Sequence, residues 1–288
     1  MIKLPKQCRP RLAGLLLAGL AGTAHAAFDI SISYTGSWTL AERNAFTQAE
    51  TFWESVITGY QPSFVQALAT ANLSLGGISI SAVSTGIDGP GLVLGSAGPT
   101  FVVDAGGYTL PVFGSMNFDS ADTATLVANG SFANVIKHEM GHVLGIGTLW
   151  VDNGVYADGT GRYTGANALA AYRTEFSQPN ASFVPVELGG NPGTADGHWN
   201  EVDGGAGLTG IRDAQGRDMR DELMTGWLNN GPNAYISQTT KASLLDIGYT
   251  VSGISAISAV PEPGMWLMLA VGTPLLTLRR RRRSTTPA

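Results

Sequence analysis

The segment HEMGH at residues 138–142 constrains the fold of this 288-residue chain more than any other stretch. On a helix, residues four apart lie one above the other, so His138 and His142 can bind a single metal ion. Glu139 lies about 100° around the helix axis from His138. From there it can reach a metal-bound water without being a ligand, which suits a general base. This arrangement of two histidines and a glutamate is typical of catalytic zinc sites.

The residues around the motif predict the helix that the motif needs. Apolar residues recur at three- and four-residue intervals from Phe132 to Leu144, which is an amphipathic helical pattern. Ser131 precedes the first of them and is a candidate N-cap, because its hydroxyl can accept a bond from a backbone N–H. Gly145 and Gly147 follow the last of them and suit a left-handed turn that ends the helix.

The third protein ligand of such a zinc site must come from elsewhere in the chain, because a catalytic zinc usually takes three. The histidines of the chain are His25, His138, His142 and His198. The first lies in the predicted signal peptide described below, so His198 is the remaining imidazole. Asp152 and Glu175 are alternatives, because zinc also accepts carboxylate oxygen. In the short pattern HExxHxxGxxH the third histidine would stand at position 148, where this chain has Thr148.

Three segments together resemble one family of enzymes. HEMGHVLGIGTLW at 138–150, GTADGHW at 193–199 and ELMTG at 222–226 are similar to the leishmanolysin-like metzincin metallopeptidases. In that family an inserted stretch separates the third histidine from the helix, and a methionine-containing turn passes beneath the metal. The eukaryotic members are rich in cysteine, whereas this chain has one, Cys8. The chain therefore resembles a bacterial branch of the family.

The resemblance implies a role for each matching residue and a fold for the chain. It implies zinc ligands at His138, His142 and His198, the general base at Glu139, the turn glycine at Gly145 and the Met-turn residue at Met224. It also implies a metzincin-like zincin of the α+β class. In such a fold a mixed twisted sheet carries the active-site helix above a loop-rich C-terminal subdomain.

The N-terminus predicts export. Residues 3–11 carry four basic side chains, Leu12–Leu20 is a short apolar run, and Ala24-His25-Ala26 fits the small-x-small rule for signal peptidase. The apolar run is far shorter than the ~20 residues that span a bilayer, which argues against an uncleaved anchor. Cys8 leaves with this peptide, so the exported protein contains no disulfides.

The C-terminus carries a second targeting pattern. Val260-Pro-Glu-Pro263 is followed by a mostly apolar segment, 264–278, and then by the arginines 279–283. This order resembles the PEP-CTERM sorting signal of Gram-negative bacteria that make extracellular polysaccharide. The resemblance implies transient inner-membrane association through 264–278, recognition by an exosortase-type enzyme, and delivery to the cell surface or extracellular matrix. A plain membrane anchor is the alternative, and in both cases the arginines stay cytoplasmic.

Charge excludes one class of partner. Of the 17 Lys and Arg residues, four lie before Ala26 and five at 279–283, which leaves eight against 21 acidic residues. A mature region with a net charge of −13 argues against nucleic acid and anionic membranes as partners.

Between its two ends the chain shows strand and helix patterns. Strands are expected within 28–36, 73–87 and 101–118, and helices at 39–60, near 166–175 and near 239–246. The expected parts are a signal peptide (1–26), an N-terminal metzincin subdomain ending with the active-site helix (27–147), a C-terminal subdomain with the third zinc ligand and the Met-turn (148–252), and a linker with the sorting segment (253–288). The tracts 152–161 and 200–207 contain Asp, Asn and Gly that can bind calcium, but neither fits the EF-hand spacing, so both are expected to be ordinary loops.

These patterns predict an exported zinc endopeptidase that acts on peptide or protein substrates. One alternative is a non-catalytic surface or matrix protein that zinc stabilises, although a structural site needs no base such as Glu139. Another is a zinc hydrolase of a non-peptide amide bond, for example in a polysaccharide or a cell-wall link.

Overall fold

A computed structural model of the whole chain describes residues 28–190, 193–201, 207–227 and 233–256. The predicted signal peptide, with Cys8 and His25, lies outside the described residues, as does the predicted sorting segment from residue 257 onward. Within the described part, no helix combines the length and the apolar character that crossing a membrane requires.

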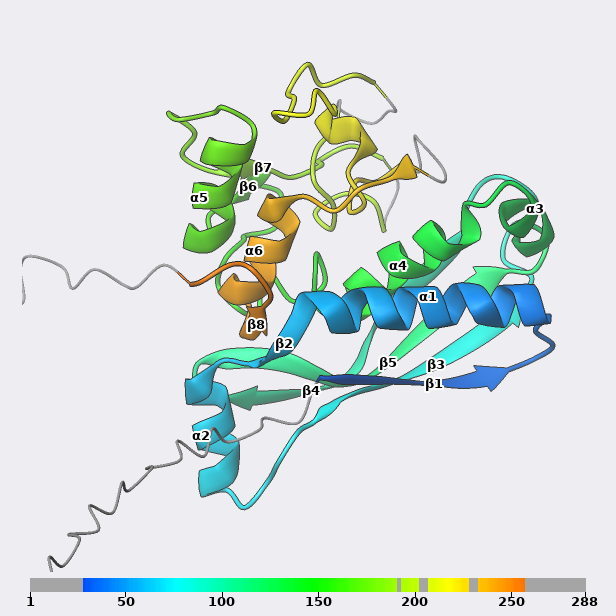
Figure 1. Cartoon of the computed structure of the whole chain (residues 1–288), viewed down its shortest axis with the longest axis horizontal. Coiled ribbons are helices and arrows are strands. Elements are labelled where there is room, and N and C mark those ends of the chain that lie inside the picture. The colour runs from blue at the N-terminus through cyan, green and yellow to red at the C-terminus, as the bar shows by residue number, and fades with distance from the viewer. Residues whose placement is uncertain (1–27, 191–192, 202–206, 228–232, 257–288) are drawn as a thin grey trace, which may run out of the picture.

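A four-stranded mixed sheet forms the base of the N-terminal half (Figure 1). Its strands, in spatial order, are β1 (Asp29–Thr35), β3 (Gly77–Thr85), β5 (Tyr108–Asp119) and β4 (Gly95–Ala105). The pairs β1–β3 and β3–β5 are parallel. The outer strand β4 runs antiparallel to β5, to which the tight turn at Gly106 and Gly107 connects it, and both glycines have positive φ. These pairings confirm the strands expected within 28–36 and 73–87. The tract 101–118, where more strand is expected, forms most of the hairpin of β4 and β5.

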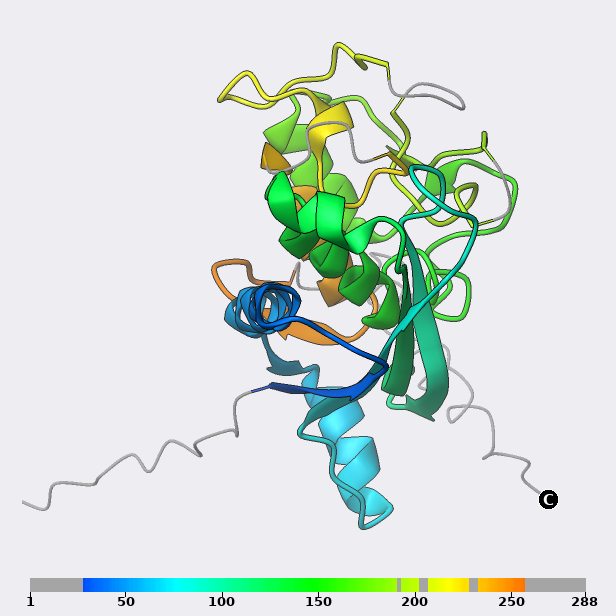
Figure 2. The ribbon, with the colours of Figure 1, turned by 90° about the vertical axis from the view of Figure 1, so that its right-hand side faces the viewer.

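Two long helices cover one face of this sheet (Figures 1 and 2). The first, α1 (Leu40–Val56), starts with a reciprocal cap in which Thr39 and Glu42 bond each other's backbone N–H groups. The second, α4 (Phe132–Val143), carries the HEMGH motif. Trp53 of α1 donates its indole N–H to the carbonyl of Lys137 in α4 at 2.9 Å, which fixes the two helices to each other.

The N-terminal core lies between the sheet and these helices. Phe46 of α1, Phe118 of β5 and Phe132 of α4 are all buried, and their rings meet edge to face with centroids 5.5–6.1 Å apart. Two shorter helices, α2 (Pro62–Thr70) and α3 (Thr123–Ala128), complete this half. Because aromatic side chains bury large apolar areas, this cluster anchors α4 on the sheet.

The helix expected over 39–60 ends earlier than its pattern predicts. Residues after Val56 form β2 (Ile57–Tyr60), which pairs antiparallel with β8 (Tyr249–Val251) near the other end of the described chain. The partner strand comes almost two hundred residues later, so a local pattern cannot reveal it. Pairing with β8 therefore outweighs the local helical pattern, and these residues adopt the extended conformation of a strand.

The C-terminal half is mostly loop. It contains α5 (Ala166–Glu175), α6 (Gln238–Asp246), a short 3₁₀ turn (Met219–Asp221) and the two-residue strands β6 (Arg162–Tyr163) and β7 (Val184–Pro185). The two helices confirm those expected near 166–175 and 239–246. The observed architecture is thus a mixed α and β fold with a mixed twisted sheet below a loop-rich half, which agrees with the expected α+β class.

Candidate metal centre

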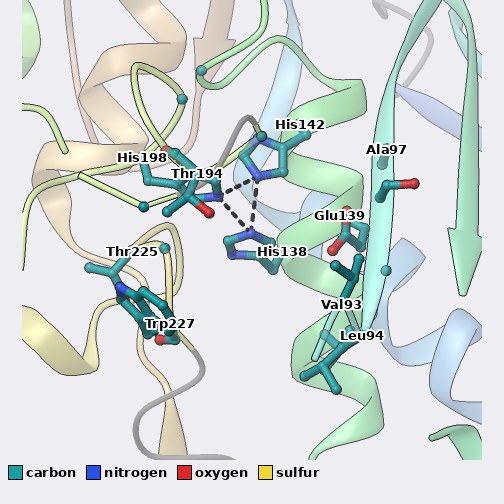
Figure 3. Close-up of a pocket in the computed structure, with 18 of the residues that line it drawn as sticks. Val93, Leu94, Ala97, His138, Glu139, His142, Thr194, His198, Thr225 and Trp227 are labelled. Carbon is teal, nitrogen blue, oxygen red and sulfur yellow. Dashed lines mark hydrogen bonds between the residues drawn. The ribbon is translucent and has the colours of Figure 1, made fainter. Parts of the chain in front are cut away.

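Helix α4 presents the motif much as its periodicity predicts. It spans Phe132–Val143 and buries an apolar face, while His138 and His142 point to the other side (Figure 3). The expected side-chain cap at Ser131 is wrong. Ser131 has helical backbone angles, with φ −88° and ψ −19°, and its hydroxyl caps no N–H group. Its carbonyl oxygen accepts bonds from the N–H groups of Asn134 and Val135 instead.

The end of α4 depends on glycine, as expected. Gly145 and Gly147 have φ +105° and +78°, in the left-handed region that side chains with a Cβ avoid. A Cβ on Gly147 would overlap the carbonyl group of Gly197, so the two backbones are in direct contact. Gly197 immediately precedes His198. The close contact between the two glycines brings the distant loop against the helix end.

Three imidazoles meet above α4 (Figure 3). The Nε2 atom of His138 lies 3.0 Å from that of His142 and 3.1 Å from that of His198, and the last two are 2.9 Å apart. A tetrahedral zinc ion with Zn–N bonds of ~2.0–2.1 Å would hold its nitrogen ligands about 3.3 Å apart. The spacing is close to that of three imidazoles arranged around one ion, and these three histidines form a cluster that could hold a metal ion.

The other ring nitrogen of each histidine is bound to a backbone carbonyl oxygen. Nδ1 of His138, His142 and His198 donates to the carbonyls of Leu223, Ile146 and Thr194, at 2.7, 2.9 and 2.8 Å. A carbonyl oxygen only accepts, so each Nδ1 carries the proton and each neutral ring turns an Nε2 lone pair inward. Three lone pairs that converge at this separation suit a shared cation. Backbone partners of this kind fix the orientation of metal-binding imidazoles.

Burial keeps these rings neutral. His138, His142 and His198 are largely removed from water, and desolvation lowers the pKa of each, in the case of His198 to about 3. A neutral imidazole is the form that binds a metal ion, because protonation would occupy the Nε2 lone pair.

Glu139 lies beside the cluster without joining it (Figure 3). Its side chain faces β4, where a Cβ on Gly95 would come 3.1 Å from a Glu139 carboxylate oxygen. Glycine at that position therefore makes room for the carboxylate. Desolvation raises the pKa of Glu139 to about 8. A buried carboxylate with a shifted pKa beside a candidate metal site is a candidate proton-transfer group.

The cluster opens into a cleft of about 960 Å³. The loop before β4 and the start of β4 (residues 91–97) form one wall, and α4 lies at the base. The opposite wall consists of residues 193–198 and 220–227. Val93 and Leu94 on one wall and Trp227 on the other lie on opposite sides of His138 (Figure 3). The site is therefore accessible to a large ligand.

Met224 lies beneath the histidine-bearing helix. It is fully buried, and a Cβ on Gly141 would come within 2.6 Å of its sulfur atom. Any side chain at Gly141, which stands between the two motif histidines, would therefore collide with Met224. The carbonyl of the preceding Leu223 binds His138, as described above, so this turn supports the cluster.

A buried glutamate that the sequence reasoning missed holds this turn. The Glu222 carboxylate accepts bonds from the backbone N–H of Met224 (2.6 Å) and Ser237 (2.9 Å) and from the Thr240 hydroxyl (2.6 Å). The same Thr240 hydroxyl accepts the indole N–H of Trp199 at 2.8 Å. This network ties the Met224 turn to the residue after His198. Its members are far apart in sequence, and the position of Glu222 two residues before Met224 is the one local signal for it.

The two carboxylate alternatives for the third ligand lie elsewhere. Asp152 is exposed in a turn. Glu175 accepts bonds from the N–H groups of Gln238 and Thr239 and so caps α6. Among the described residues, the three histidines are the one group of three or more His, Cys, Asp or Glu side chains close enough to hold one metal ion.

No family model matches this chain, and no curated protein matches its sequence. The function is therefore inferred from the site itself.

Proposed function

We propose that this protein is an exported zinc-dependent endopeptidase of the leishmanolysin-like metzincin type. The observation that carries the proposal is the combination of three inward-facing neutral imidazoles with a buried carboxylate that is not a ligand, at the base of an open cleft. A structural zinc site is usually closed by four protein ligands, whereas a catalytic one keeps a position open.

Zinc fits this donor set. Imidazole nitrogen is a common zinc ligand, and three histidines with an open fourth position are a known catalytic arrangement. His138, His142 and His198 would hold the ion. When bound, zinc lowers the pKa of a coordinated water to about 7 and polarises the scissile carbonyl group.

Glu139 performs the proton transfers. Its carboxylate takes a proton from the attacking water and delivers it to the leaving amine. Burial raises the pKa of Glu139 in the metal-free protein, and a zinc ion bound beside it would favour the charged carboxylate, which is the form that accepts a proton. Gly95 leaves space for this carboxylate at the wall of the cleft.

The cleft suits an extended polypeptide. β4 is the outer strand of the sheet, and Gly95, Ser96 and Ala97 at its start line the cleft. An outer strand offers unpaired backbone groups to which an extended chain can add as a further strand. The exposed apolar side chains of Leu92 and Trp227 also line the cleft and favour amino-acid side chains as ligands. These features support a peptide substrate over a polysaccharide amide.

Casein hydrolysis by the purified mature protein is the direct test. We expect cleavage that a chelator abolishes and that zinc restores, with Glu139→Gln as the inactive control. A protein that binds zinc but cleaves neither casein nor a peptide mixture would point to a zinc-stabilised surface or matrix protein. Cleavage of a cell-wall or polysaccharide amide without casein hydrolysis would favour the other alternative.

We also propose that the ends of the chain direct export and sorting, as the sequence patterns at 1–26 and 253–288 indicate. Signal peptidase removes the first segment, and an exosortase-type enzyme cuts near Pro261 to Pro263. Mass spectrometry of surface material from the native host should find neither Cys8 nor the arginines 279–283. Material that retains the arginines would indicate a plain anchor instead.

A further inference from the structure

Residues 194–198 form a small loop that the His198 side chain itself closes. Nδ1 of His198 donates to the carbonyl of Thr194 at 2.8 Å, so any movement of this loop also moves the group that orients the imidazole. Asp196 is the middle residue. Its φ is +64°, in the left-handed region that is uncommon for residues other than glycine. The surroundings must therefore hold Asp196 in place.

The Asp196 carboxylate binds the inserted segment that follows α4. The hydroxyl of Tyr156 donates to Oδ1 of Asp196 at 2.5 Å, and the backbone N–H of Gly159 donates to the same oxygen at 2.8 Å. On the other side, the Asp196 backbone N–H donates to the carbonyl of Glu187 at 2.8 Å. Asp196 is thus fixed from two directions, two residues before the candidate metal ligand.

Tyr156 is held firmly enough to position Asp196. Its side chain is buried, and its hydroxyl oxygen also accepts the N–H of Gly161 at 3.1 Å. Its ring packs against Trp150 with centroids 6.0 Å apart, and Trp150 packs against Trp199 at 4.7 Å. Tyr156 therefore contacts the chain on both sides of His198. Its hydroxyl binds Asp196, two residues before His198, and its ring packs on Trp150, which contacts Trp199 directly after His198.

We propose that Asp196, held by the Tyr156 hydroxyl, is a positioning residue that fixes His198 for metal binding. The stretch around Tyr156, which sequence reasoning treats as an ordinary loop, is then a functional part of the metal centre. The inference rests on the proposed function only in assigning His198 as a metal ligand, and it does not depend on which bond the enzyme cleaves.

Zinc affinity of the purified protein, measured by competition with a chelating dye, tests this role. Tyr156→Phe removes the hydroxyl and keeps the ring. Asp196→Gly removes the carboxylate and relieves the left-handed backbone conformation. Changes in the groups that support metal ligands typically weaken affinity by ~10- to 100-fold, and we expect a loss of about 10-fold in each variant. The double variant should lose less than the sum of the two single losses, because both changes break the bond between Tyr156 and Asp196.

Tyr163→Phe is the matched control. Tyr163 belongs to the same aromatic cluster, packs against Trp199, and also donates its hydroxyl to a carboxylate, that of Asp246 at 3.1 Å. That bond leads to α6 rather than to residues 194–198. Tyr163→Phe should therefore keep the zinc affinity of the unmutated protein, although it also loses a buried hydrogen bond.

Thermal unfolding of the metal-free variants separates positioning from general stability. The proposal predicts that Asp196→Gly weakens zinc binding while its metal-free unfolding temperature stays close to that of the unmutated protein. Unchanged zinc affinity in both Tyr156→Phe and Asp196→Gly would overturn it, and so would an equal loss in Tyr163→Phe. If the unmutated protein binds zinc and shows this pattern but cleaves no peptide, the proposed peptidase function fails and the positioning role stands.

Discussion

Gly147 and Gly197 pack backbone against backbone, and this contact joins the end of the motif helix to the loop that carries the third histidine. Neither residue has a side chain that binds anything. A Cβ on Gly147 would overlap the carbonyl group of Gly197, whereas a Cβ on Gly197 would point into open space. The approach of these two segments, which are fifty residues apart, therefore depends on glycine at position 147.

Gly147→Ala should weaken zinc binding by about 10-fold or more, because the new Cβ would push residues 194–198 away from the helix. An alanine held in the left-handed conformation of Gly147 would also lower the free energy of unfolding by ~1–2 kcal/mol. Zinc titration and thermal unfolding of the metal-free protein measure the two effects separately.

Gly154→Ala is the control for that cost. Gly154 has φ +68°, similar to the +78° of Gly147, and open space where a Cβ would point. Both variants should lose similar metal-free stability from backbone strain. Only Gly147→Ala should lose zinc affinity, and equal affinities in the two variants would show that the glycine contact does not position His198.

The sequence predicted those parts of the site that depend on local spacing. The helix with His138 and His142 follows from periodicity, and the positive φ of Gly145 follows from the turn that must end it. His198 was reached by elimination among the histidines and by resemblance, and the structure places it with the other two.

The missed features all depend on tertiary pairing. Glu222 and Thr240 bond each other across eighteen residues, and Tyr156 reaches Asp196 across forty. No periodic pattern links such positions. The strand β2 was missed for the same reason, because its partner β8 lies at the other end of the described chain.

Glu139→Gln should reduce peptidase activity by at least ~10²-fold while zinc content stays near that of the unmutated protein. The carboxylate transfers protons but binds no metal, and the amide keeps its shape. Activity on casein and metal analysis of the same preparations give the two values. A loss of zinc comparable to that in a histidine variant would contradict the assignment of Glu139 as the base.

The same substitution should change how the metal-free protein responds to pH. Burial raises the pKa of Glu139 from 4.5 to about 8, so the folded state binds this proton more tightly than the unfolded chain. The resulting stability is fully present below about pH 4.5 and is lost as the pH rises to about 8. Glu139→Gln lacks a titrating group at this position and should avoid that loss.

Thermal unfolding of both metal-free proteins between pH 5 and 8 provides the measurement. The unfolding temperature of Glu139→Gln should exceed that of the unmutated protein by a margin that grows with pH. The three histidines also contribute to the pH dependence in this window, because their imidazoles take up protons in the unfolded chain but stay neutral in the fold. They are common to both proteins, so their contribution cancels in the difference. A margin that stays constant with pH would show that Glu139 is not buried as a high-pKa carboxyl.

His198→Ala is the decisive substitution for the metal centre. The Nε2 atom of His198 lies 2.9 Å from that of His142 and 3.1 Å from that of His138. The substitution therefore removes one of three converging ligands. Zinc affinity should fall by orders of magnitude. The thermal stabilisation that zinc confers should disappear with it, because a ligand that binds only the folded state stabilises by mass action.

The two carboxylate alternatives for the third ligand, Asp152 and Glu175, serve as matched controls with different expected results. Asp152→Ala should change neither zinc affinity nor stability, because Asp152 is exposed in a turn. Glu175→Ala should keep its zinc affinity but lose ~1 kcal/mol of stability, because Glu175 caps the N-terminus of α6. Isothermal titration with zinc and unfolding with and without the metal distinguish the three variants. Full zinc affinity in His198→Ala, together with its loss in Asp152→Ala, would assign the third ligand to Asp152 and place the protein in a different group of zinc hydrolases.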